Sequence, residues 1–172
     1  MQYRKLGKTG LDVSVIGLGC AQLGSPNTDY AVRLVQRALD LGVTYIDLAR
    51  GYRDAEIKVG LAIKASLLAG DRDKLVLSTK TSRRTRDEAW REINESLERV
   101  GTDYLDNVHL HALDSSEDID KRLGPGGAME ALLEAREQGL VHHVGCSSHY
   151  PQTLVEAVQR FPFEVILCIQ PG

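Results

Sequence analysis

Short apolar runs recur along the chain, and each of them predicts a β-strand. Longer segments between these runs repeat their apolar residues at helical spacing. The segment 29–41, for example, places Val35 and Ala38 on one face. It ends before Gly42, and glycine commonly follows the last turn of a helix. The predicted strands are 15–19, 43–47, 74–80, 106–111, 143–147 and 165–169, and the predicted helices are 29–41, 55–68, a helix that follows Thr85, 128–138 and 151–160.

The strict alternation of strands and helices predicts an α/β fold with a parallel sheet. Residues 3–14 precede the first strand and predict a short N-terminal hairpin. Both a doubly wound open sheet and a barrel fit the alternation, but the sequence from Gly17 to Gln22 lacks the Gly-x-Gly-x-x-Gly turn of a dinucleotide-binding open sheet. We therefore expect a (β/α)8 TIM-barrel type of fold.

The length makes this expected barrel incomplete. A full barrel takes about 250 residues, and the chain has 172. We expect one partial TIM-barrel domain, residues 1–172, with about six parallel strands and five helices, truncated about two βα units early. The connection 112–127 is acidic and then rich in Gly and Pro, and it is predicted to be a long loop that acts as a lid or a mobile segment.

Composition narrows the classes of partner. The chain has 21 Lys and Arg against 24 Asp and Glu, and 5% of its residues are aromatic, which argues against binding to nucleic acid. No apolar run approaches the roughly 20 residues of a membrane span, and the first residues lack the apolar core of a signal peptide. Three cysteines without a CxxC spacing predict neither a disulfide framework nor a zinc site. We expect a cytoplasmic protein with a small-molecule partner.

Four polar residues follow consecutive predicted strands. Asp47, Lys80 and His111 end the second, third and fourth strands, and Tyr52 lies five residues beyond Asp47. Each has an ordinary structural explanation by itself, such as a loop-stabilising carboxylate or a lysine that extends to water. The carboxyl ends of parallel strands meet at one face, however, so we expect these side chains to lie together.

Together the four residues predict a proton-donating site. A tyrosine has an ordinary pKa near 10; a neighbouring ammonium from Lys80 is expected to lower it, and Asp47 is expected to keep Lys80 charged. His111 is expected to hold the oxygen of a carbonyl substrate while Tyr52 protonates it. None of these side chains supplies a hydride, so the site implies a nicotinamide cofactor.

Several short motifs resemble those of the aldo-keto reductase superfamily, over the whole chain. The interval from Asp47 to Tyr52 and the run Leu77-Ser-Thr-Lys80 are the most specific of them. The other matching motifs are Gly17-Leu-Gly-Cys20, Ala55-Glu56 with Val59-Gly60, Asp103-Tyr-Leu-Asp106 with His111, and Val144-Gly-Cys-Ser147, and the stretches after His111, Gly124 and Gly145 are similar to the branch whose longer members carry a ferredoxin-like C-terminal extension.

The resemblance implies an oxidoreductase that reduces aldehydes or ketones with NADP(H), or alternatively NAD(H). Its catalytic tetrad transfers to Asp47, Tyr52, Lys80 and His111, with Tyr52 as the general acid. The family usually has Asn where this chain has Ser148, and a serine hydroxyl is a shorter replacement for an amide. The implied cofactor-binding residues are Gly19, Cys20, Asp47, Ser147, Ser148 and Gln170.

The expected truncation has two consequences. The last two family strands carry most of the contacts to the cofactor's phosphates, so the activity of the 172-residue chain itself is left open. The first and sixth strands would each expose an outer edge, and long exposed edges pair with other chains. We therefore expect self-association through these edges.

Two other functions remain open on the sequence alone. The chain could be a non-catalytic barrel fragment that serves as a binding or assembly module. It could also be a metal-dependent hydrolase, because His109 and His111 form an HxH pair on one face of a strand. The reductase is the leading hypothesis, although the absent phosphate-binding loops favour the binding module for this fragment. We rank the hydrolase well below the reductase, because Lys80 would repel a metal ion at this position, and we assign no metal ligands.

Overall fold

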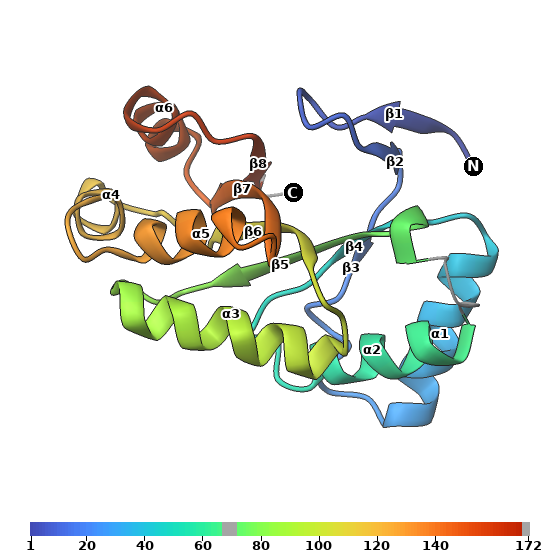
Figure 1. Cartoon of the computed structure of the whole chain (residues 1–172). Coiled ribbons are helices and arrows are strands. Elements are labelled where there is room, and N and C mark those ends of the chain that lie inside the picture. Colours follow the sequence, from blue (N-terminus) through green and yellow to red (C-terminus); the bar gives the residue numbers. More distant parts are fainter. Residues whose placement is uncertain (67–71, 170–172) are drawn as a thin grey trace.

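The N-terminal residues form the predicted hairpin. The computed structural model describes residues 1–66 and 72–169 of the chain (Figure 1). The strands β1 (Tyr3–Lys5) and β2 (Asp12–Ser14) pair in antiparallel fashion. The connection between them holds Gly7 and Gly10 at φ angles of 53° and 80°, which glycine adopts without the steric penalty of a Cβ atom.

The main sheet has six parallel strands, as predicted. They lie in sequence order, so each strand pairs with the strand that follows it in the chain. A doubly wound sheet would reverse its strand order at a switch point, and the observed order instead is that of an incomplete barrel. The six strands are β3 (Leu18–Gly19), β4 (Tyr45–Asp47), β5 (Val76–Thr81), β6 (Leu105–Leu110), β7 (Val141–Ser148) and β8 (Val165–Cys168).

The helices form a layer that follows the order of the strands (Figure 1). In that layer α1 packs on α2, α2 on α3, and α3 on α5. No helix among residues 1–66 and 72–169 is both long and apolar enough to cross a membrane. The helices are α1 (Thr28–Asp40), α2 (Ala55–Ser66), α3 (Arg86–Val100), α4 (Ser116–Leu123), α5 (Ala128–Glu137) and α6 (Pro151–Arg160), and a 3-10 turn, η1 (Arg72–Lys74), precedes β5.

The helix α4 corrects the prediction of a long structureless loop and of five helices. It lies inside the segment 112–127, and the hydroxyl of Ser115 caps it by accepting a hydrogen bond from the backbone N–H of Asp118. Of its eight residues only Ile119 and Arg122 are buried. A helix with so few apolar residues gives almost no periodic signal, which is why the sequence predicted a loop.

Alternation along the strands places polar side chains on the inner face of the curved sheet. In β5, Thr79 bonds to Glu56 of α2 and Thr81 bonds to Glu92 of α3, so the odd-numbered residues face the helices. Lys80 and Ser78 consequently face the opposite side. Strand β6 continues this inner face, because the amide of Asn107 donates to the hydroxyl of Ser78 at 2.9 Å. The inner face therefore carries the groups that build the candidate site.

Candidate active site

The predicted carboxylate and ammonium form an ion pair at the ends of β4 and β5. Lys80 Nζ lies 2.7 Å from Asp47 Oδ2 and donates to the carbonyl of Leu48 at 2.6 Å. Both side chains sit on adjacent strands, with Asp47 in register with Ser78, so the sheet itself sets their separation. The second oxygen of Asp47, Oδ1, is buried and has no hydrogen-bond donor among the described residues.

Tyr52 folds back over this pair from the turn after β4. Its hydroxyl lies 3.4 Å from Lys80 Nζ, and the same ammonium lies 5.0 Å from the centre of the tyrosine ring. The turn is built by backbone hydrogen bonds from Tyr52 N to Ala49 O and from Ala55 N to Tyr52 O. The phenol of Tyr52 thus shares the ammonium of Lys80 with Asp47.

His111 joins the cluster through its contact with Tyr52. It follows β6, and its ring meets the ring of Tyr52 edge to face, with centroids 5.9 Å apart at 85°. The guanidinium of Arg122 fixes its backbone by donating to the His111 carbonyl at 2.6 Å. The structure therefore brings together all four residues that the sequence singled out, while the catalytic role of each stays a prediction.

Burial has the largest effect on the pKa values of both residues of the ion pair. Burial raises the pKa of Asp47, and the ammonium of Lys80 opposes that rise. Burial lowers the pKa of Lys80, and the carboxylate of Asp47 opposes that fall. Each partner therefore keeps the other charged in a site that disfavours both charges.

The pKa of Tyr52 differs from the sequence prediction. Burial raises it above its ordinary value, and the carboxylate of Asp47 raises it further. The pKa that was predicted to fall is instead raised in the free chain, because burial and the carboxylate of Asp47 outweigh the ammonium of Lys80, which pairs with Asp47 at 2.7 Å. Tyr52 accordingly holds its proton at neutral pH.

His111 is neutral at neutral pH. Burial, together with the positive charges of Lys80 and Arg122, lowers the pKa of His111 from 6.5 to about 4. One ring nitrogen, Nδ1, lies 3.4 Å from the hydroxyl of Ser82. A neutral imidazole in this position can donate one hydrogen bond and accept another.

Gly19 and Cys20, at the end of β3, offer the site their backbone groups and no reactive side chain. Gly19 is exposed, and a Cβ atom there would meet nothing within 4 Å. Cys20 is buried and donates its backbone N–H to the carbonyl of Asp47 at 2.9 Å. Burial raises the pKa of the Cys20 thiol to about 12, so it is not a nucleophile. The predicted cofactor contact Gln170 lies outside the described residues.

The two serines at the end of β7 are buried and already hydrogen-bonded. Ser147 accepts from the backbone N–H of Ala112 at 3.0 Å, which leaves its own hydroxyl proton available. The hydroxyl of Ser148 contacts Asp114 at 2.8 Å and Thr153 at 2.7 Å, and it also accepts from the backbone N–H of Tyr150. Of the two serines, Ser147 is therefore the better candidate for a cofactor contact.

The HxH pair does not form a metal centre in the described part of the chain. His109 is fully buried on the inner face, and its Nδ1 lies 3.1 Å from the carbonyl of Cys146. Burial lowers its pKa to about 3, so it is a neutral structural residue. No three His, Cys, Asp or Glu side chains among residues 1–66 and 72–169 gather as metal ligands, which leaves the hydrolase alternative without a third ligand.

The sequence reading missed the residues that hold the turn of Tyr52. Glu56 is fully buried, accepts from the hydroxyl of Thr79 at 2.8 Å and pairs with Arg99 at 3.0 Å. Arg99 also bonds the backbone carbonyl of Arg53, the residue after Tyr52. A glutamate in the first turn of a helix usually faces solvent, so only its position beside Val59 and Gly60 in the family motif could have marked it.

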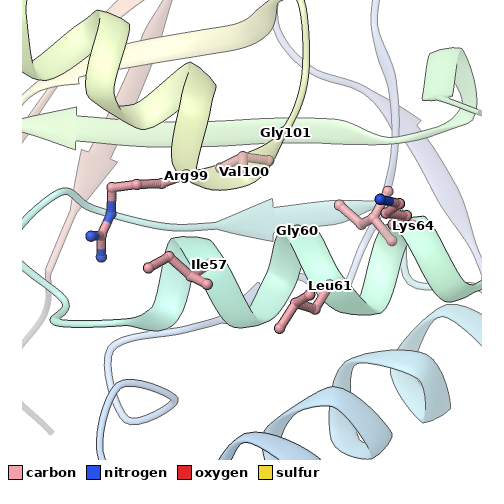
Figure 2. Close-up of a pocket in the computed structure, with 8 residues that line it drawn as sticks. Ile57, Gly60, Leu61, Lys64, Arg99, Val100 and Gly101 are labelled. Carbon is pink, nitrogen blue, oxygen red and sulfur yellow. The ribbon is translucent and has the colours of Figure 1, made fainter.

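One cavity lies away from these four residues. It has a volume of about 450 Å³ and is lined by Ile57, Gly60 and Leu61 of α2 together with Val100 and Gly101 at the end of α3 (Figure 2). The two helices approach closely there, since a Cβ atom on Gly60 would fall 2.3 Å from the carbonyl of Val100. The cavity carries no residue of the Tyr52 cluster, so we do not assign it to the chemistry.

Comparison with known proteins agrees with the fold and with the family resemblance of the sequence. The family model described as "Aldo/keto reductase family" matches residues 15–171. The chain is 33% identical to the uncharacterized oxidoreductase YqkF of Bacillus subtilis over 93% of its own length and 53% of that protein. It is 29% identical to L-glyceraldehyde 3-phosphate reductase of Escherichia coli, over 97% of its own length and 52% of that protein.

Solved structures show the same likeness. The holo form of the aldo-keto reductase AKR11C1 from Bacillus halodurans superimposes with a TM-score of 0.83 at 30% identity, covering 99% of this chain and 58% of that one. A thermostable aldo-keto reductase, Tm1743, superimposes with a TM-score of 0.77 at 29% identity, covering 93% of this chain and 58% of that one. The chain thus spans about half the length of the curated relatives it matches.

Proposed function

The chain belongs to the aldo/keto reductase family, and we propose that it contributes the proton-transfer site of an enzyme that reduces aldehydes or ketones to alcohols with NADP(H) or NAD(H). The observation that supports this most directly is the position of Lys80, whose ammonium lies 2.7 Å from Asp47 and 3.4 Å from the hydroxyl of Tyr52. A phenol beside a buried ammonium is suited to protonating an oxygen that gains negative charge.

Tyr52 is the proposed general acid. Its raised pKa keeps it protonated at neutral pH, so it holds the proton that the substrate oxygen needs. As that proton leaves, negative charge develops on the phenol oxygen 3.4 Å from the ammonium of Lys80. Attraction between these charges grows as the proton moves, and it therefore stabilises the transition state more than the ground state.

Asp47 and His111 position the other groups. Asp47 keeps Lys80 charged and fixed despite burial, together with the carbonyl of Leu48. The neutral ring of His111, in contact with the ring of Tyr52, offers a hydrogen bond to the substrate oxygen without adding a charge. Arg122 holds the backbone of His111 and so keeps this ring over the cluster.

The described residues fit a nicotinamide cofactor at the mouth of the strands. The exposed backbone of Gly19 leaves open space, the buried Oδ1 of Asp47 lacks a donor, and the hydroxyl proton of Ser147 is available. Gly19, Cys20, Asp47 and Ser147 would hold the nicotinamide end, and Ser148 would support it from behind. A bound dihydronicotinamide supplies the hydride that these side chains lack.

The test is carbonyl-dependent oxidation of NADPH and NADH by the purified protein, with DL-glyceraldehyde and methylglyoxal as probes. We expect Tyr52→Phe to lower kcat by about 10²- to 10⁴-fold, the usual contribution of a general acid. Tyr30→Phe, on the exposed surface of α1, is the matched control and should leave the rate unchanged.

An unchanged rate in Tyr52→Phe would show that the general-acid assignment is wrong. A non-catalytic binding module predicts a different outcome, in which no probe accelerates coenzyme oxidation in the unmodified protein. Calorimetric titration with NADPH then separates a module that binds the coenzyme from one that does not.

A further inference from the structure

Lys58 is an unusual buried cation outside the cluster described above. It lies on α2, only 5% exposed, and its described partners are all backbone carbonyls. Its Nζ lies 3.1 Å from Leu23 O, 3.2 Å from Gly24 O and 2.7 Å from Pro26 O. An ammonium has three N–H donors, so these three carbonyls match its full donor set.

The carbonyls belong to the loop 20–27, which connects β3 to α1. Burying a charge is costly unless it is fully hydrogen-bonded, and here the protein meets that requirement with loop backbone alone. The three carbonyls accept no other hydrogen bond among the described residues. Three carbonyl dipoles that converge without a cation repel one another, so the conformation of this loop depends on the ammonium of Lys58.

The same loop packs directly on the turn of Tyr52. A Cβ atom on Gly24 would lie 2.5 Å from the carbonyl of Tyr52 and 2.8 Å from Cβ of Arg53, which places loop backbone against turn backbone. At its start the loop is tied to the site by the hydrogen bond from Cys20 N to Asp47 O at 2.9 Å. Leu23, next to Gly24, is 5% exposed and packs into the core.

We propose that Lys58 is a positioning residue that holds the β3–α1 loop against the turn of Tyr52 and thereby shapes the mouth in which the carbonyl substrate binds. The inference rests on the proposed function for its effect on catalysis. Its effect on the loop is independent of that function. The hydrogen bonds described for the Lys58 side chain all go to this loop and none goes to Tyr52, Lys80 or Asp47, so Lys58 acts through the loop.

The experiment compares Lys58→Met, which keeps the length of the side chain but removes the charge, with the unmodified protein. Amide hydrogen exchange should become about 10- to 100-fold faster in residues 20–27 and 48–54, the factor that corresponds to losing charge-assisted hydrogen bonds. Lys64→Met is the matched control, because Lys64 lies on the same helix and is exposed; it should leave both segments unchanged.

A second variant distinguishes the loss of the ammonium from a general loss of stability. Lys58→Ala leaves a cavity of the shape of propylammonium, and adding propylammonium chloride should restore slow exchange in both segments. Tetramethylammonium chloride has the same charge but no N–H donor, so it should not restore it. Slow exchange in Lys58→Met, or equal recovery with both salts, would overturn the proposal.

Kinetics supply a separate readout. In Lys58→Met the KM for the carbonyl probe should rise about tenfold, because the wall of the mouth has moved. Lower stability alone would reduce the active fraction and hence the apparent kcat, with KM unchanged.

If the unmodified protein does not reduce carbonyls, the proposed function fails while the exchange data still decide the role of Lys58. If it does reduce them and KM is unchanged in Lys58→Met, the effect of Lys58 on the mouth is refuted.

Discussion

Lys80 Nζ lies 2.7 Å from Asp47 Oδ2, and the two side chains are 1% and 19% exposed. The pair is therefore an ion pair in which one partner is almost wholly removed from water. Separating it by mutation leaves an uncompensated charge in a buried site, which costs far more than losing a pair at the surface. The same burial makes the pair useful, because attraction between charges is strongest where water is excluded.

We predict that Lys80→Met lowers the free energy of unfolding by about 3–5 kcal/mol. The double variant Asp47→Asn/Lys80→Met should lose less than the sum of the two single variants, because it leaves no unpaired charge. Urea unfolding of the four proteins gives the coupling energy. The surface pair Arg50–Glu95, also at 2.7 Å, is the control and should show a coupling below about 1 kcal/mol. Additive losses for Asp47 and Lys80 would contradict the prediction.

His109 should make the protein less stable in mild acid. Its pKa is about 3 in the folded chain against 6.5 in an exposed imidazole. Between these values the unfolded chain binds a proton that the folded chain does not, so the free energy of unfolding falls as the pH drops from about 6.5 towards 3. The contribution of His109 to the free energy of unfolding is therefore fully present above about pH 6.5.

Urea unfolding at about pH 7 and about pH 4.5 measures this loss. His109→Gln retains an amide that can donate to the Cys146 carbonyl but cannot take up a proton in this range. It should lose less stability between the two pH values than the unmodified protein does. An equal loss in both proteins would place the acid sensitivity in other groups.

A methyl group at position 145 should lower the stability of the fold. A Cβ atom there would lie 2.5 Å from the carbonyl of Val165 on β8 and 2.8 Å from Nδ1 of His109. Both neighbours are fixed, one by the sheet and one by its bond to Cys146. We expect Gly145→Ala to cost about 1–3 kcal/mol of unfolding free energy, measured by thermal or urea unfolding. Gly19→Ala, where a Cβ atom meets nothing within 4 Å, is the control for stability.

Self-association through the outer strands remains a prediction. In the described sheet β3 and β8 are the outermost strands, and Ile166 on β8 is 48% exposed. Exposed apolar edges favour pairing between chains, and a charge placed on such an edge opposes it.

Sedimentation velocity should show dimers or larger species, and Ile166→Lys should shift them towards monomer. Val155→Lys, on the exposed face of α6, should have no such effect. A stable monomer of the unmodified protein at tens of micromolar would argue against this edge pairing.

The strands were predictable because their signal is local. Each is a short apolar run between turn residues, and all six appear in the structure within a few residues of their predicted positions. The first was the least accurate: residues 15–19 were predicted, but only Leu18–Gly19 pair in the sheet. Val15 and Ile16 are apolar but exposed, so their side chains gave a strand signal that the packing does not use.

The amino-acid order alone determined the alternation of strands and helices, and with it the meeting of Asp47, Lys80 and His111 at one end of the sheet, because residue spacing and parallel strand direction are properties of the chain itself. Only the tertiary structure decided the charges and the supports of that site. Burial raises the pKa of Tyr52 against the predicted direction, and Lys58 and Glu56, polar residues of α2 that a sequence reading places in water, are buried. Burial and long-range hydrogen bonds depend on which segments pack together, and no local pattern carries that information.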